Sequence, residues 1–213
     1  PIMDGFAKYL SYELPVLQIT WARYFFTVLF TFPLMFFFFK KYLVWTDKPK
    51  LQLIRGLILL IANICFFYSI SVISLPKALT LAFVAPLVVT AFSPFFLGES
   101  VGYRRWAAVI IGFIGSLVVI RPGFLEINLA SLAALGTGIM YGFYLIITRK
   151  LSTSDNPLLT LLLTGVVGAI IATTFMPFVW VSPTFNQWSI MAAIGLFACI
   201  GHLFIILSLK YAD

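Results

Sequence analysis

Long apolar runs follow one another along almost the whole chain, separated by short polar turns. Residues 1–12 resemble the end of a truncated first span, and seven complete runs follow it. They are Pro15–Phe39, Leu51–Ile73, Leu75–Leu97, Tyr103–Arg121, Glu126–Thr148, Pro157–Val181 and Gln187–Leu209. A helix needs about 20 residues to cross about 30 Å of hydrocarbon. The pattern therefore predicts an all-α, polytopic membrane protein with seven complete spans.

The composition supports lipid as the solvent of these runs. Of 213 residues, 62% are hydrophobic and 10% are charged, and the mean hydropathy is +1.08. A soluble domain carries about 25% charged residues. Cys65 and Cys199 both fall inside apolar runs, so we interpret them as small packing residues.

The basic residues predict the orientation, because cytoplasmic loops carry an excess of Lys and Arg. If the loop after Phe39 is cytoplasmic, ten basic residues lie on that side and three lie outside. The net charge of +7 therefore reflects topology, and no nucleic-acid partner is expected. The cytoplasmic set is Lys40, Lys41, Lys48, Lys50, Arg55, Arg104, Arg105, Arg149, Lys150 and Lys210, and the outer set is Lys8, Lys77 and Arg121.

Weak internal matches indicate a repeat. Lys8 and Lys150 each precede a proline by seven residues, and YSISV can be laid over LSLKY at nearly the same offset. The loop FKKYLVWTDKPK is basic, whereas its counterpart WVSPTFNQW carries no charge. A unit with five spans enters the membrane upside down the second time. We therefore expect inverted repeats at 1–123 and 124–213, the second without its last two spans.

The segment from Leu75 to Gly123 resembles the end of an EamA domain of the drug/metabolite transporter superfamily. That family has a proline in the fourth span, Gly-Glu at its cytoplasmic end and a Gly-rich fifth span. The matching residues are Pro86, Gly98, Glu99, Gly112 and Gly115. Arg23 in TWARYFF matches the family's second-span arginine, and SLKYAD resembles the opening of its ninth span.

The resemblance implies ten helices in two inverted five-helix repeats around a central path. It implies alternating-access transport of a small metabolite in a bacterial inner membrane, often export of amino acids or related compounds. Most of span one and all of spans nine and ten are missing from this sequence, so we expect no transport by this fragment alone. A small-molecule substrate and the lipid bilayer are the expected partners, no cofactor or metal is expected, and a homodimer is left open.

Two other classes of membrane protein are considered. Seven complete spans also suit a receptor or photosensor, but a retinal protein needs a Lys in the middle of its last span, and Lys210 lies at the end. An intramembrane enzyme would need an acid, a base or metal ligands, and no such constellation is found.

Polar side chains inside the apolar runs are the candidates for the substrate path, because they are costly in lipid. Arg23 forms a stripe with Thr20, Thr27 and Thr31 at helical spacing. This stripe is either a helix-packing face or the lining of a cavity in which Arg23 attracts an anionic group. Both readings stay open from sequence.

The span at Glu126–Thr148 has a second polar face. Tyr141 and Tyr144 share an arc with Thr137 and Thr148. They either stack an aromatic or cationic metabolite or pack in the core. Gly138 and Gly142 form a GxxxG on the neighbouring arc, which predicts close approach of another helix.

Asn63 and His202 occupy matching places when the repeats are overlaid. Each either bonds a neighbouring helix or faces the central path, where His202 could serve proton coupling. Pro86 and Pro94 are hinge or kink candidates, with a static bend as the alternative.

Two short segments beside the fourth span are given structural roles. We expect Glu99, Arg104 and Arg105 to fix a cytoplasmic turn. We expect the segment from Gly112 to Gly115 to be a close packing face.

Overall fold

The computed structural model describes residues 2–39, 46–98, 100–120, 128–152 and 154–211. Within these ranges the chain is helical, and none of the described residues forms a β-strand, so the all-α prediction is confirmed. The helices are α1 (Ile2–Leu10), α2 (Val16–Phe39), α3 (Pro49–Val72), α4 (Leu75–Ala82), α5 (Ala85–Leu97), α6 (Tyr103–Ile120), α7 (Leu129–Ser152), α8 (Pro157–Val179) and α9 (Phe185–Tyr211).

Six segments of the described chain are long and apolar enough to cross a membrane. They are Val16–Phe37, Pro49–Val72, Leu75–Leu97, Leu129–Ser152, Pro157–Val179 and Phe185–Tyr211. The predicted span Tyr103–Arg121 forms the 18-residue helix α6, which is not among the six, and its last residue lies outside the described ranges. Glu99 and Glu126 also lie outside them, so the predicted role of Glu99 stays a prediction.

The span predicted at Leu75–Leu97 consists of two helices, not one. Helix α4 ends at Ala82, and α5 begins at Ala85 after a turn at Phe83 and Val84. Pro86 lies in the first turn of α5 and has no N–H to donate to the carbonyl of Ala82. The ladder of helical hydrogen bonds is therefore interrupted at this place.

Local signals explain several helix ends. Pro49 begins α3, where the missing N–H of proline costs nothing. The side chain of Asn156 caps α8 by accepting a 2.9 Å hydrogen bond from the backbone N–H of Leu158. Gly98 ends α5 with φ of +70°, in the left-handed region that favours glycine.

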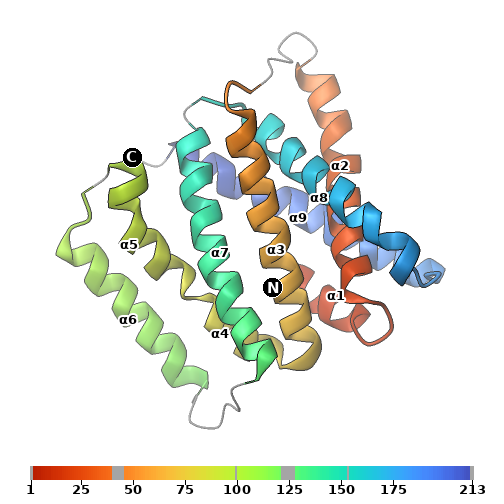
Figure 1. Ribbon diagram of the computed structural model, residues 1–213, viewed down its shortest axis with the longest axis horizontal. Helices are drawn as coiled ribbons and strands as arrows, with labels where there is room; N and C mark the ends of the chain where they lie inside the picture. The colour runs from red at the N-terminus through yellow and green to blue at the C-terminus, as the bar shows by residue number, and fades with distance from the viewer. Residues whose placement is uncertain (1, 40–45, 99, 121–127, 153, 212–213) are drawn as a thin grey trace.

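Helices α3 and α7 lie side by side at the centre of the bundle, and α2 packs against α8 and α9 (Figure 1). Helix α6 forms the opposite edge and packs against α4 and α5. The predicted packing face at Gly112 and Gly115 is wrong for the described residues. Both glycines are exposed, and a Cβ built on either would meet no atom within 4 Å. Gly112 instead lines a hollow between α6 and the residues Phe83 and Pro86.

The predicted GxxxG contact on α7 is confirmed. A Cβ added at Gly138 would lie 2.6 Å from the carbonyl oxygen of Ala82, and one at Gly142 would lie 2.7 Å from Cβ of Val88. The two glycines thus let α7 approach the backbone at the break between α4 and α5. Such close approach through small residues is a common packing mode of membrane helices.

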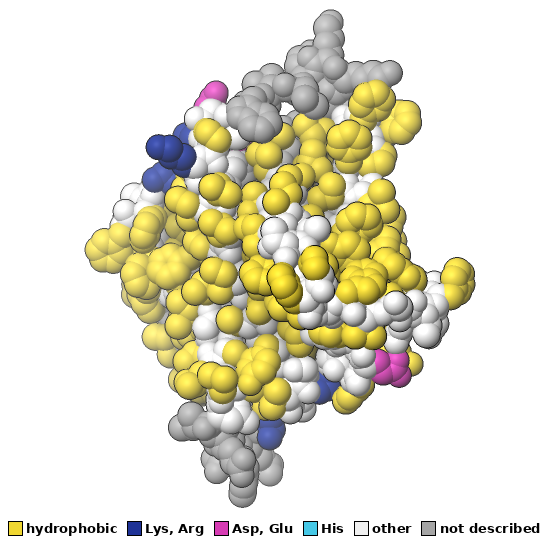
Figure 2. All heavy atoms as spheres, turned by 45° about the vertical axis from the view of Figure 1, so that its right-hand side comes forward, with side chains coloured by type: hydrophobic (Ala, Val, Ile, Leu, Met, Phe, Trp, Pro, Cys, Tyr) yellow, Lys and Arg dark blue, Asp and Glu magenta, His cyan; other side chains and the backbone are white. Residues whose placement is uncertain are grey.

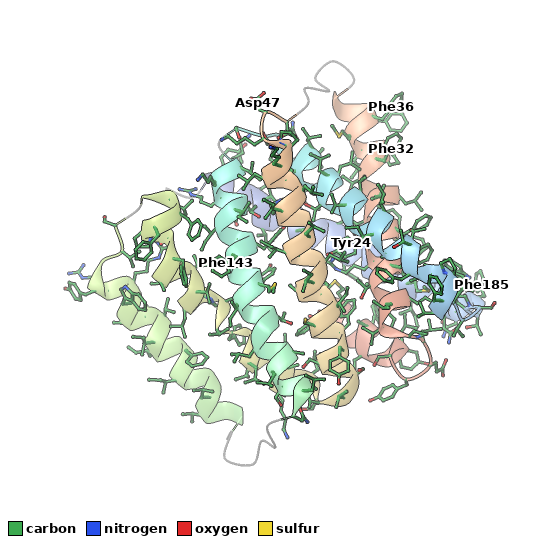
Figure 3. All side chains as sticks on the ribbon, viewed as in Figure 1. Tyr24, Phe32, Phe36, Asp47, Phe143 and Phe185 are labelled. Atoms are coloured by element: carbon green, nitrogen blue, oxygen red, sulfur yellow. The ribbon has the colours of Figure 1, made fainter. Side chains whose placement is uncertain are left out.

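Large apolar side chains cover the outside of the bundle. The face in Figure 2 is largely hydrophobic, with a few charged side chains toward its upper and lower ends. On α2, Phe32 and Phe36 point outward and are 59% and 52% exposed, whereas Tyr24 points into the bundle and is 1% exposed (Figure 3). A surface of large apolar side chains suits a protein that is surrounded by lipid.

The interior holds an apolar cluster and buried hydroxyls. The cluster joins residues of six helices, among them Leu10, Ile19, Phe67, Ala78 and Ile194. Cys199 is buried at 3% exposure, which confirms it as a packing residue, whereas Cys65 is only partly buried.

Candidate functional site

A cavity of about 510 Å³ lies between α1, α2, α3, α4, α7 and α9. Four of the five substrate-path candidates line it, namely Arg23, Asn63, Tyr141 and His202. Tyr144 lies behind this wall at 1% exposure. The structure therefore brings all five together, although they come from four different helices.

Arg23 and His202 are in direct contact across the α2–α9 boundary. Nη2 of Arg23 lies 2.7 Å from Nε2 of His202, and the hydroxyl of Tyr144 lies 3.1 Å from Nδ1 of the same imidazole. These two hydrogen bonds link side chains of α2, α9 and α7 in one continuous hydrogen-bonded series. Arg23 is 2% exposed, and its Nε has no hydrogen-bond partner among the described residues.

Tyr24 supports Arg23 from the other side. The guanidinium carbon of Arg23 lies 4.8 Å from the centroid of the Tyr24 ring, within the range of a cation–π contact. The Tyr24 hydroxyl accepts a 2.8 Å hydrogen bond from Nδ2 of Asn63. Asn63 also donates a 2.7 Å bond to the carbonyl of Leu59, so its Nδ2 has two partners within the wall of the cavity.

Tyr141 and Tyr144 stack on each other. Their ring centroids are 5.5 Å apart with an interplanar angle of 24°, and Tyr141 also meets the His202 ring at 6.5 Å and 76°. Only Tyr141 lines the cavity. One tyrosine is therefore available to a ligand, while the other fixes the wall.

A second buried arginine joins the site. The sequence pattern predicts Arg55 among the cytoplasmic basic residues and not in the site, yet it is 0% exposed within α3. It donates hydrogen bonds to the hydroxyls of Thr148 and Thr164 and to the carbonyl of Thr160. Its guanidinium carbon lies 5.3 Å from the centroid of the Tyr144 ring.

A helical spacing in the sequence could have found this arginine. Gln52, Arg55, Leu59 and Asn63 share one face of α3, and Asn63 was already a candidate. Arg55 thus belongs to the same interior face as the cavity wall.

A set of buried, hydrogen-bonded polar side chains lies between Arg55 and the predicted cytoplasmic ends of the helices. Oδ2 of Asp155 accepts hydrogen bonds of 2.6 Å from the Thr46 hydroxyl and from Nε2 of Gln52. Gln52 also lies 3.2 Å from the hydroxyl of Thr160. This group ties the start of α3 to the α7–α8 connection, so it fixes one end of the helices that surround the cavity.

The proline candidates occupy different settings. Pro86 lies in the first turn of α5, at the α4–α5 break, four residues after Ala82, which lines the cavity. Pro94 lies inside the continuous helix α5. The hinge role of either residue stays a prediction.

Comparison with known proteins places this architecture in a family. The model of the EamA-like transporter family matches residues 2–121. An S-adenosylmethionine uptake transporter of Rickettsia bellii (strain RML369-C) is 25% identical over 207 residues, which cover 97% of this chain and 70% of that protein. A pseudopaline exporter, CntI, of Pseudomonas aeruginosa (strain UCBPP-PA14) is 24% identical over 96% of this chain and 72% of its own.

Further similarities cover part of the chain or the fold alone. A riboflavin transporter of Vibrio cholerae serotype O1 is 36% identical over 81 residues, 38% of this chain and 27% of that protein. A crystal structure of a protein aligns with 100% of this chain and 76% of its own chain, with a TM-score of 0.77 and 18% identity. At this identity the likeness shows the fold only.

These findings agree on one class of protein. The relatives are membrane transporters of small metabolites, and the apolar helices of this chain make it a multi-pass protein of the inner membrane. Because the family model covers more than half of the sequence, the chain belongs to the EamA-like transporter family.

Proposed function

We propose that this protein carries a small metabolite with a carboxylate group, an amino acid or a related compound, through the cavity beside Arg23. The supporting observation is the guanidinium itself. It is buried, it lines the cavity, and its Nε lacks a partner among the described residues. A buried cation without full compensation is costly, so an anionic group of the solute would stabilise it.

The rest of the cavity suits a solute with an apolar or ring-shaped part. Phe66, Tyr141 and Phe197 present aromatic surface, and Asn63 and Thr137 present polar groups. S-adenosylmethionine, the solute named for the Rickettsia relative, combines an amino-acid carboxylate with a purine ring. It is therefore the first solute to test.

Alternating access between two inverted repeats is the proposed mechanism. The packing supports it, because related contacts recur in pairs. If α1, α2 and α3 of the first repeat correspond to α7, α8 and α9 of the second, the contact of α2 with α9 matches that of α8 with α3. The contact of α3 with α7 then matches that of α9 with α1. This is the pairing that repeats at 1–123 and 124–213 would give, and the cavity then lies between them, as in other transporters with inverted repeats.

The test is transport by the full-length protein in proteoliposomes. We expect uptake or efflux of at least one carboxylate-bearing solute from a panel that includes S-adenosylmethionine, riboflavin and amino acids. Both directions are measured, because the relatives include an uptake transporter and an exporter. No flux of any solute would contradict the proposal, and binding without flux would favour a receptor.

Arg23→Gln tests the carboxylate contact. We expect it to raise KM for the transported solute by about tenfold or more, since a hydrogen bond to a charged group contributes about 1.5–3 kcal/mol. Lys50→Gln is the matched control, because it removes a positive charge from an exposed position. An equal effect of both variants, or a loss of folded protein alone, would favour a packing role for Arg23.

A further inference from the structure

The hydrogen bonds around His202 determine which of its nitrogens carries the proton. A guanidinium has N–H donors and no acceptor, so Arg23 Nη2 donates the 2.7 Å bond and His202 Nε2 accepts it. A neutral imidazole has one acceptor and one donor. The proton therefore lies on Nδ1, where it donates to the Tyr144 hydroxyl at 3.1 Å.

We propose that His202, as the neutral Nδ1–H tautomer, is a positioning residue that holds the guanidinium of Arg23 against the cavity. The part of this inference that concerns a solute rests on the proposed function. The tautomer rests only on the Arg23–His202–Tyr144 geometry.

Two contacts hold Arg23 at the wall of the cavity. His202 accepts from Nη2, and the Tyr24 ring supports the guanidinium at 4.8 Å. Nε is without a partner among the described residues, and the arginine lines the cavity. A long side chain that is fixed before binding loses less conformational freedom when the solute arrives. His202 and Tyr24 thus preorganise the cation for a carboxylate.

This arrangement separates positioning from proton coupling. An imidazolium donates from both nitrogens, so a second proton on Nε2 would remove the acceptor and leave two cations 2.7 Å apart. Tyr141 and Tyr144 of α7 contact the imidazole, Arg55 of α3 lies against the Tyr144 ring, and Asp4 of α1 lines the same cavity. In this conformation His202 therefore holds Arg23 and carries no proton for transport.

The tautomer can be measured without any transport assay. The full-length protein is labelled with ¹⁵N-histidine in lipid nanodiscs near neutral pH, and the His202 signal is assigned by its loss in His202→Gln. We expect a protonated Nδ1 and an unprotonated Nε2. In Arg23→Met we expect a shift toward the Nε2–H form. A wild-type Nε2–H tautomer or an imidazolium would overturn the proposal, whether or not the Arg23 variant folds.

The positioning role is tested with two variants of similar size. Gln at 202 offers a carbonyl oxygen where Nε2 lay, whereas Phe keeps a ring and offers no acceptor. We expect His202→Phe to raise KM for S-adenosylmethionine by about tenfold, and to change KM for its decarboxylated analogue by less than about twofold. His202→Gln should recover most of the loss.

Two results would overturn the positioning role. One is equal damage to both probes, and the other is a Gln variant no better than Phe. If the wild-type protein transports no solute at all, the proposed function fails, and the NMR measurement alone decides the assignment of His202.

Discussion

Asn63 on α3 donates a 2.8 Å hydrogen bond to the hydroxyl of Tyr24 on α2. Tyr24 is also the ring that supports Arg23, so this single contact connects α3 to the cation in the cavity. Its strength is therefore a measure of how firmly the cavity wall is held.

Tyr24→Phe should weaken the fold slightly, because interhelical hydrogen bonds in membrane proteins contribute about 0.6 kcal/mol on average. Thermal or denaturant unfolding of the purified protein measures the change in free energy of unfolding. Combined with Asn63→Leu in a double-mutant cycle, it should give a coupling energy of about that size. Strictly additive effects would show that the two side chains do not interact.

Much of the architecture was accessible from hydropathy, whereas the break in the fourth span was not. The stretch around Phe83 and Val84 is uniformly apolar, and Pro86 is its only irregular residue. A proline is compatible both with a kink inside a helix and with the first turn of a new one. The choice depends on α7, which packs against the break through Gly138 and Gly142.

The candidate site could also be predicted only in part from the sequence. Arg23, Asn63, Tyr141 and His202 were found because polar groups are rare in lipid-spanning runs. Arg55 was missed because it lies near a basic loop, where the positive-inside rule already explains an arginine. Small residues were ambiguous as well, since Gly112 and Gly142 give the same sequence signal, and only Gly142 has a neighbouring helix in contact.

Gly195→Ala should destabilise the contact between α9 and α2. An added Cβ would lie 2.2 Å from Cβ of Phe26 and 3.1 Å from its backbone. Overpacking of this kind costs about 1–3 kcal/mol, which thermal unfolding would detect. The control is Gly201→Ala on the same helix, where no atom lies within 4 Å of the added Cβ. Equal stability of the two variants would contradict this packing.

Arg55→Lys should lower stability although the substitution keeps the positive charge. The guanidinium donates hydrogen bonds to Thr148, Thr160 and Thr164. A lysine ammonium cannot reproduce the planar, forked arrangement of these donors. We expect a loss of about 1–3 kcal/mol in the free energy of unfolding, as for buried polar groups left without partners.

The matched control for Arg55 is Lys50→Met, at an exposed position on the same helix, which should change stability by less than about 0.5 kcal/mol. If Arg55→Lys were as neutral as this control, the threonine contacts would not contribute measurably.

Pro86→Ala should slow transport without weakening solute binding. The new N–H could donate to the carbonyl of Ala82 and join α4 to α5 as a continuous helix. A stiffer fourth span would hinder any rocking that bends at this break, so we expect the maximal rate to fall by about threefold or more while KM changes by less than about twofold. Initial rates over a range of solute concentrations separate the two parameters.

Pro94→Ala is the control for the hinge, because Pro94 lies inside a helix that is continuous in the structure. Its replacement adds one backbone donor without closing a break, so the maximal rate should stay near that of the wild type. A static bend at Pro86 would leave both variants at the wild-type rate. Equal slowing by both would show that the span needs flexibility along α5 as a whole, and the assignment of the hinge to the break at Phe83 and Val84 would then be wrong.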